Sequence, residues 1–226
     1  MKKISFIKYL IICIFVNITV LNAQNDTTKL VKYTPNFKFR DGIYLNFLQL
    51  KQNRPIPKSK IISNINYHNI NFFDKLLLNK KIEYIDKYRL KQEVLTNKIW
   101  GYCRNGTLYI NWGNDFNRIP IIGSICHFVA TITVYENRYN PYSYYHNNYY
   151  NTEPSSRSNV ETNQYVLDFE TGKILEYTCK NILIQLMKDE ILYDEYNSLR
   201  KKKQKQLKFI YLRKYNKKHP LYLPIN

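Results

Sequence analysis

Glycine is scarce in this chain, with 6 residues among 226. Loops that cradle phosphate groups and the sharp turn that presents a catalytic serine both depend on glycine. The sequence contains no glycine-rich phosphate loop, no G-x-S-x-G turn and no H-E-x-x-H zinc motif. The sequence pattern therefore argues against nucleotide-driven chemistry and against the common hydrolase families.

Histidine is also scarce, and the four histidines are widely separated in the sequence. None lies at a metal-ligand spacing from another histidine or cysteine, apart from the adjacent pair Cys126 and His127. Neighbouring residues on a strand point to opposite faces, so these two side chains are not expected to bind one ion. We therefore expect no metal and no other cofactor.

Only three cysteines follow the N-terminal segment: Cys103, Cys126 and Cys179. A disulfide between Cys103 and Cys126 is one interpretation, because exported proteins form disulfides and both residues lie in apolar, strand-like surroundings. Buried thiols that act as small hydrophobic residues fit the same pattern. A catalytic thiol paired with His127 or His68 would need an exposed, electropositive setting, and the apolar surroundings favour a core position instead.

Long apolar runs are missing too, since a membrane-spanning helix needs roughly 20 apolar residues. The run Leu10–Leu21 has about a dozen residues, follows three lysines and precedes the small-residue site around Ala23. This order predicts a secretory signal peptide over residues 1–24, rather than a signal anchor or a lipoprotein processed at Cys13. The mature protein is then expected in the periplasm, at the outer membrane or outside the cell, with no transmembrane span.

Acidic residues are outnumbered by basic ones, 17 against 35, which gives a net charge of +18. The segment from Arg200 onward contains only bases among its charged residues. It suits an anionic partner, such as a lipid or an acidic glycan, whereas export argues against nucleic acid. A solvated, lysine-rich helix face has the same composition. The residues expected to contact the partner are Arg200, Lys201, Lys202, Lys203 and Lys205.

Turn signals and apolar periodicity predict the main elements. The segment 98–112 carries Asn-Gly at its centre and 164–177 carries Glu-Thr-Gly, and both predict hairpins. Helical spacing follows over 179–187 and 189–218, while residues 47–53 fit a short helix stopped by proline. Strands first and helices last predict an α+β fold, in which an antiparallel sheet of hairpins packs against helices.

About 200 residues remain after the signal peptide, enough for one domain with a hydrophobic core. Residues 25–36 are polar and lack periodicity, so we expect a flexible leader there. The single domain then runs over 37–226. Within it, residues 135–163 are rich in tyrosine and asparagine, which predicts a low-complexity insertion outside the core.

Two carboxylates, Asp168 and Glu170, flank the turn of the second predicted hairpin. Alternate residues of a strand share a face, and glycosidases use such a pair about 5 to 9 Å apart in a cleft. Acids beside turns are more commonly solvated. A hydrolase that acts on envelope glycan or peptide is therefore an alternative hypothesis, and it requires a pocket that gathers these side chains.

Ordered short motifs run through the chain from about residue 38: Asp41-Gly42-Ile43-Tyr44-Leu45, Trp100-Gly101-Tyr102, Arg118-Ile119-Pro120, and Arg213-Lys214-Tyr215-Asn216 followed by His219-Pro220-Leu221-Tyr222. Together they resemble a family of exported Bacteroidetes-type bacterial proteins that has no assigned activity. The resemblance implies export to the envelope and supplies no catalytic or binding residue. The insertion at 135–163 looks specific to this chain, which argues against a shared functional site there.

Export, the lack of a catalytic constellation and the charge concentrated after Arg200 favour one hypothesis above the others. It is a non-enzymatic module that binds or builds part of the cell envelope or the secreted fraction, with an unidentified surface partner. The hydrolase described above is the first alternative. The second is a binder of an anionic polymer or membrane through the basic C-terminal helix.

Overall fold

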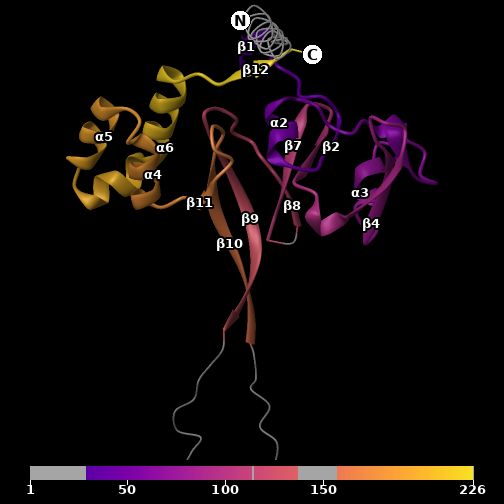
Figure 1. Ribbon diagram of the computed structural model, residues 1–226. Coiled ribbons are helices and arrows are strands. Elements are labelled where there is room, and N and C mark those ends of the chain that lie inside the picture. The colour runs from indigo at the N-terminus through magenta and orange to yellow at the C-terminus, as the bar shows by residue number, and fades with distance from the viewer. Residues whose placement is uncertain (1–28, 114, 137–156, 226) are drawn as a thin grey trace, which may run out of the picture.

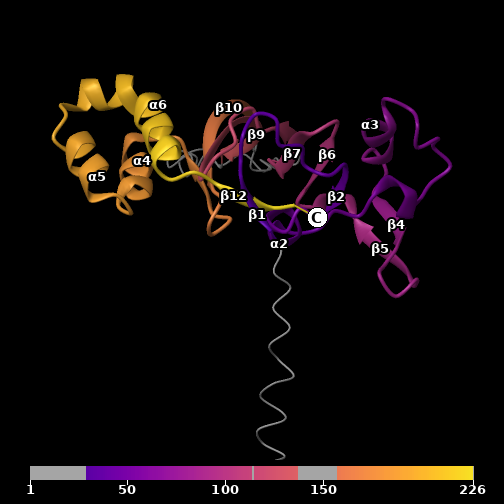
Figure 2. The same cartoon turned by 90° about the horizontal axis from the view of Figure 1, so that it is seen from above.

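The computed structural model describes residues 29–113, 115–136 and 157–225, so the predicted signal peptide lies outside the described residues. Antiparallel sheets built from hairpins lie beside C-terminal helices, which confirms the predicted α+β fold. The C-terminal helices occupy one end of the molecule and the sheets lie in the middle. The segment 58–98, which we call the lobe, occupies the other end (Figures 1 and 2).

A four-stranded antiparallel sheet forms the centre, in the order β2-β6-β7-β8. Its predicted hairpin is confirmed, because Asn105 and Gly106 connect β6 to β7 with φ of 52° and 74°. Two left-handed residues match the twist of the flanking strands, and Asn-Gly adopts this conformation at low cost. The strands are β2 (Gly42–Tyr44), β6 (Gly101–Arg104), β7 (Thr107–Trp112) and β8 (Asp115–Arg118).

A second sheet, β11-β10-β9, contains the two longest strands, β9 (Ile125–Glu136) and β10 (Arg157–Asp168). They pair along their whole length and form a long twisted ribbon (Figure 1). The third strand, β11 (Ile174–Glu176), completes the predicted second hairpin. The two ends of the predicted insertion over 135–163 form strand rather than loop, because 135–136 and 157–163 belong to this ribbon. The remainder of the insertion, 137–156, lies outside the described residues.

The lobe is a three-stranded sheet with a short helix, α3 (Phe72–Leu76), packed on it. Phe72, Phe73 and Leu76 are buried there beside Ile82. The turn between its last two strands closes on one carboxylate, because Asp86 Oδ1 accepts hydrogen bonds from the backbone of Tyr88 and Leu90. Its strands are β3 (Ile61–Ile62), β4 (Lys81–Ile85) and β5 (Lys91–Leu95), and the predicted short helix before it is α2 (Phe47–Lys51).

The predicted helix over 189–218 is two helices, α5 (Glu190–Asn197) and α6 (Lys201–Lys218), which follow α4 (Cys179–Leu186). The chain breaks between them because Gln204 turns its side-chain amide back to the carbonyls of Tyr196 and Asn197. These hydrogen bonds add partners to the carbonyls at the end of α5, where a helix has no further turn to supply them.

The predicted flexible leader over 25–36 contains strand β1 (Leu30–Lys32). This strand pairs with β12 (Tyr222–Pro224), and the backbone of Tyr33 donates to Leu221 O at 2.7 Å. Leu223 has no exposed surface, so its burial in the core holds the pair in place. The described end segments therefore lie side by side (Figure 1). Among the described residues, no helix is both long and apolar enough to cross a membrane.

Strand β10 separates two hydrophobic cores. Tyr165 and Leu167 point into the core between the sheets, while Val166 points into the core beneath α4 to α6. Strand β9 follows the same alternation, with Cys126 on the first side and Ile125 on the second. The period of two residues thus lets one ribbon carry both the central sheet and the helices.

Candidate functional site

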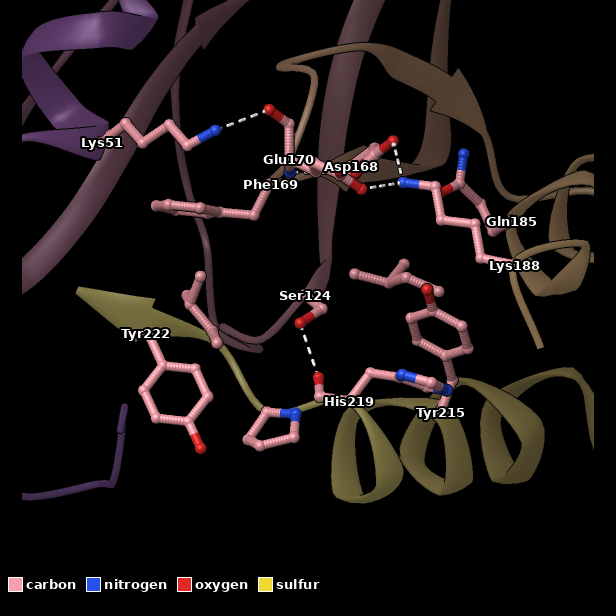
Figure 3. Close-up of a pocket in the computed structure, with 13 residues that line it drawn as sticks. Lys51, Ser124, Asp168, Phe169, Glu170, Gln185, Lys188, Tyr215, His219 and Tyr222 are labelled. Atoms are coloured by element: carbon pink, nitrogen blue, oxygen red, sulfur yellow. Dashed lines mark hydrogen bonds and ion pairs between the residues drawn. The ribbon is translucent and has the colours of Figure 1, made fainter. Parts of the chain in front are cut away.

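A cleft of about 360 Å³ lies where the second hairpin, the α4–α5 connection and the end of α6 meet (Figure 3). Both carboxylates of the hydrolase hypothesis line it, together with Lys188, His219 and Ser124. The structure therefore brings Asp168 and Glu170 together in one cleft, and their hydrogen bonds and ion pairs determine whether they suit catalysis.

The carboxylate of Asp168 accepts hydrogen bonds from residues of the hairpin turn. Its Oδ1 accepts from the backbone of Glu170 at 2.9 Å, and its Oδ2 accepts from the Thr171 hydroxyl at 2.9 Å. Lys188 contacts both carboxylates, at 3.3 Å from Asp168 and at hydrogen-bond distance from Glu170 (Figure 3).

Partial burial lowers the pKa of Lys188, but the Glu170 hydrogen bond and the Asp168 charge outweigh this and hold it above its usual value. A glycosidase needs a carboxyl group that is free to give a proton to the substrate, whereas Asp168 accepts hydrogen bonds from the turn and both acids are paired with Lys188. The three residues therefore form an ion-pair network that secures the turn, and the geometry does not favour the hydrolase hypothesis.

Ser124 and His219 line this cleft, and Asp189 contacts His219, in an arrangement that does not support a catalytic triad. Ser124 Oγ donates to the backbone oxygen of His219 at 2.6 Å, whereas triad chemistry requires the hydroxyl to bond the imidazole. The imidazole Nε2 lies 2.5 Å from Asp189 Oδ2. Hydrogen bonds from Lys218 and His219 lower the pKa of Asp189 to about 2. Asp189 thus ties the start of α5 to the end of α6.

The two strand thiols, Cys103 and Cys126, do not suit a nucleophile. Cys103 and Cys126 are free and buried, so of the two interpretations the structure supports core thiols rather than a disulfide. Burial raises the pKa of both thiols, to about 12 for Cys126. A thiol nucleophile needs the opposite shift. His127 faces the helices, opposite the core side chain of Cys126, as the strand alternation predicts.

The basic residues picked from the sequence lie together at the start of α6. Arg200 is the N-cap and donates no side-chain cap hydrogen bond, and no acid occupies the first turn. All five side chains are exposed, and within the described part of the chain none makes an ion pair. Three bases nearer the middle and end of α6 do find partners: Lys208, Lys214 and Lys218.

Comparison with protein-family models, curated proteins and solved structures finds no match to this chain. The likeness to an exported Bacteroidetes-type family therefore stays a prediction. Among the described residues, no group of histidine, cysteine and acidic side chains is placed to hold a metal ion.

Sequence reasoning found some of these residues and missed others. Asp189, the first residue of the segment predicted as helical over 189–218, caps α5, because its Oδ1 accepts from the backbone of Leu192 at 3.2 Å. The roles of Lys188 and His219 were missed, because their partners lie 18 to 30 positions away in the sequence. No local pattern marks such contacts.

Proposed function

We propose that this protein is an exported, non-enzymatic binding module that docks on a membrane surface rich in anionic lipid through the exposed bases of α6. The observation that carries the proposal is the set of five basic side chains, Arg200 to Lys203 and Lys205, that are exposed and without ion pairs among the described residues. The predicted signal peptide over 1–24 supports it, because export places the protein beside such surfaces.

Further bases extend this cluster along the exposed side of α6. Lys202, Arg213 and Lys217 recur at the helical repeat, opposite the buried side chains of Tyr211 and Tyr215. From Lys202 to Lys217 the row is about 22 Å long at 1.5 Å per residue. Such a row suits an extended anionic surface better than a single small anion.

The charges at the start of α6 oppose helix stability. A helix N-terminus carries a partial positive charge, and a nearby cation costs about 0.3 to 1 kcal/mol at low ionic strength. The first turn holds Lys201, Lys202 and Lys203 without an acid to offset them. An anionic surface would relieve this repulsion, so the arrangement is better suited to the bound state than to the free one. Ile210, which is 49% exposed on the same helix, adds an apolar contact.

The test compares two variants that lose the same charge. One replaces Lys201, Lys202, Lys203 and Lys205 with glutamine, and the other replaces four exposed lysines of the lobe: Lys60, Lys75, Lys87 and Lys98. Co-sedimentation of the full chain with vesicles of phosphatidylglycerol and phosphatidylcholine measures binding. Because a base near such a surface contributes about 1 kcal/mol, the α6 variant should bind at least about tenfold more weakly, and salt should weaken the wild type.

The lobe variant should keep most of its affinity. An equal loss of vesicle affinity in both variants would mean that net charge, and not the position of the bases on α6, drives binding. Failure of the wild type to bind these vesicles, or binding to soluble polygalacturonate in preference to them, would overturn the lipid assignment.

A further inference from the structure

A second cleft, of about 710 Å³, lies between the lobe and the central sheet. Its volume is within the range of about 300 to 1,000 Å³ that small-molecule sites occupy. Residues from the end of α3, the end of β5 and strands β6 to β8 line it. The lobe and α6 lie at opposite ends of the molecule (Figures 1 and 2), so this cleft is separate from the basic cluster.

One side of the cleft is apolar and open to solvent. Leu78 is 85% exposed and Leu95 is 49% exposed, and both line the cleft. Phe116 joins them from β8, partly buried, with its ring against Tyr102 at 5.4 Å between centroids. Apolar side chains that gather at a cleft and stay exposed are a common mark of a binding surface.

Hydrogen-bonding groups supply the rest of the lining. The ring of Tyr102, which lines the cleft, packs against Phe73 and Tyr109 at 5.0 and 4.6 Å between centroids, and its hydroxyl is the polar group that this residue brings to the lining. Burial raises the pKa of Tyr102 to about 12, so this hydroxyl remains a donor. Asn111 donates its amide to Ile99 O at 3.0 Å, which leaves its side-chain oxygen as an acceptor.

The charges of the lining are balanced. Asp74 is paired with Arg104 at 2.7 Å, and Asp115 and Lys80 carry opposite charges on exposed side chains. A polyanion or a polycation would therefore meet a charge of its own sign. An uncharged ligand with both an apolar face and a polar edge meets no such penalty.

The geometry points to a binding site for a neutral carbohydrate in this cleft. A sugar ring presents C–H groups on its faces, which pack on aromatic and aliphatic side chains such as Phe116 and Leu78. Its hydroxyls are both donors and acceptors and match Tyr102, Asn97 and Asn111 around the cleft. This site is independent of the membrane contact proposed for α6. The sugar site and the membrane contact would lie at opposite ends of the molecule.

The experiment uses isothermal titration of the full chain with three neutral trisaccharides, maltotriose, cellotriose and chitotriose. We expect at least one to bind. The variants Leu78→Ser and Asn97→Ala change exposed side chains, so the fold is preserved, and each should weaken binding by about tenfold, equivalent to 1.4 kcal/mol. Leu48→Ser, which changes a leucine that is 59% exposed on α2, is the matched control and should bind like the wild type.

Two further probes test the chemistry of the ligand. Trigalacturonate is the charged counterpart and should bind more weakly, while N-phenyl-1-naphthylamine tests for a purely apolar ligand. The inference is overturned if none of the trisaccharides binds, if the two cleft variants bind like Leu48→Ser, or if either probe binds more tightly than every trisaccharide. The glutamine variant of α6 should retain sugar binding, which separates this result from that of the vesicle assay.

Discussion

His127 is a buried histidine with one nitrogen left without a partner. It is 8% exposed, its Nε2 lies 3.1 Å from the Gln164 side-chain oxygen, and Nδ1 has no hydrogen-bond partner among the described residues. Tyr177 and Phe209 pack on the ring at 4.7 and 6.0 Å between centroids. Protonation would add both a second buried N–H and a positive charge to this apolar setting, which is costly.

Burial lowers the pKa of His127; the hydrogen bond with Gln164 opposes this, and the charge of Lys208 adds to it. The unfolded chain, with a histidine pKa of about 6.5, therefore binds a proton more readily than the folded protein. Neutral His127 therefore contributes its full share of stability above about pH 6.5, and this contribution is lost as the pH falls below that value.

We predict that His127→Gln loses less stability than the wild type when the pH falls from about 7.5 to about 5. Urea unfolding followed by circular dichroism at the two pH values measures the difference. His68→Gln removes an exposed imidazole and is the control. An acid-induced loss of the same size in wild type and His127→Gln would show that His127 does not set the pH dependence.

At the scale of elements, one asparagine of α6 bonds directly to the backbone of the neighbouring sheet, beside the hydrophobic core that the two share. Asn216 Oδ1 accepts from the backbone of Ile125, and its Nδ2 donates to the Ile125 oxygen, each at 2.8 Å. The side chain thus behaves like a short strand beside the start of β9. Gly123 leaves room for it, since a Cβ there would lie 2.5 Å from Asn216 Nδ2.

Gly123→Ala should lower the free energy of unfolding by about 1 to 3 kcal/mol, because the asparagine must move and two hydrogen bonds to a strand end are lost. Asn216→Ala removes the same bonds and the steric conflict together. In the double variant, the glycine substitution should therefore cost much less than it does alone. Urea denaturation of the wild type, both single variants and the double variant measures the coupling. Strict additivity would contradict the proposed contact.

The elements that could be predicted from sequence are those with local causes. The two hairpins followed from short turns. The starts of α4 and α5 follow from their N-cap residues, Thr178 and Asp189, whose side chains accept backbone hydrogen bonds from within three residues. The ribbon of β9 and β10 was missed over 157–163, because polar residues on an exposed strand look like a loop. The break between α5 and α6 at residue 198 was missed, because Gln204, whose side chain bonds back to the end of α5, lies six positions further along the chain.

For the whole molecule, the candidate site was the part least visible in the sequence. Asp168 and Glu170 stand out in the sequence as a pair, but Lys188, which forms ion pairs with both, comes from another element. The cleft beside the lobe gathers residues from positions 74 to 116, and its apolar members are also typical of a core. A pocket is a property of packing between elements, so periodicity within each element does not reveal it.

The pairing of β1 with β12 has consequences for the whole fold. It joins segments that lie almost 200 positions apart, and it depends on Leu223, which has no exposed surface and contributes to the core between the two sheets. Its neighbour Tyr222 is 54% exposed on the same strand. The two residues therefore share the backbone pairing and differ in burial.

We predict that Leu223→Ala lowers the free energy of unfolding by about 2 to 5 kcal/mol, the usual cost of removing a buried leucine side chain. Tyr222→Ala should cost far less, because its side chain is largely solvated. Hydrogen exchange locates the effect: the amides of residues 30–32 should lose protection in Leu223→Ala and keep it in Tyr222→Ala. If those amides stayed protected without the leucine, the backbone pairing alone would hold β1, and burial of Leu223 would not be what closes the fold.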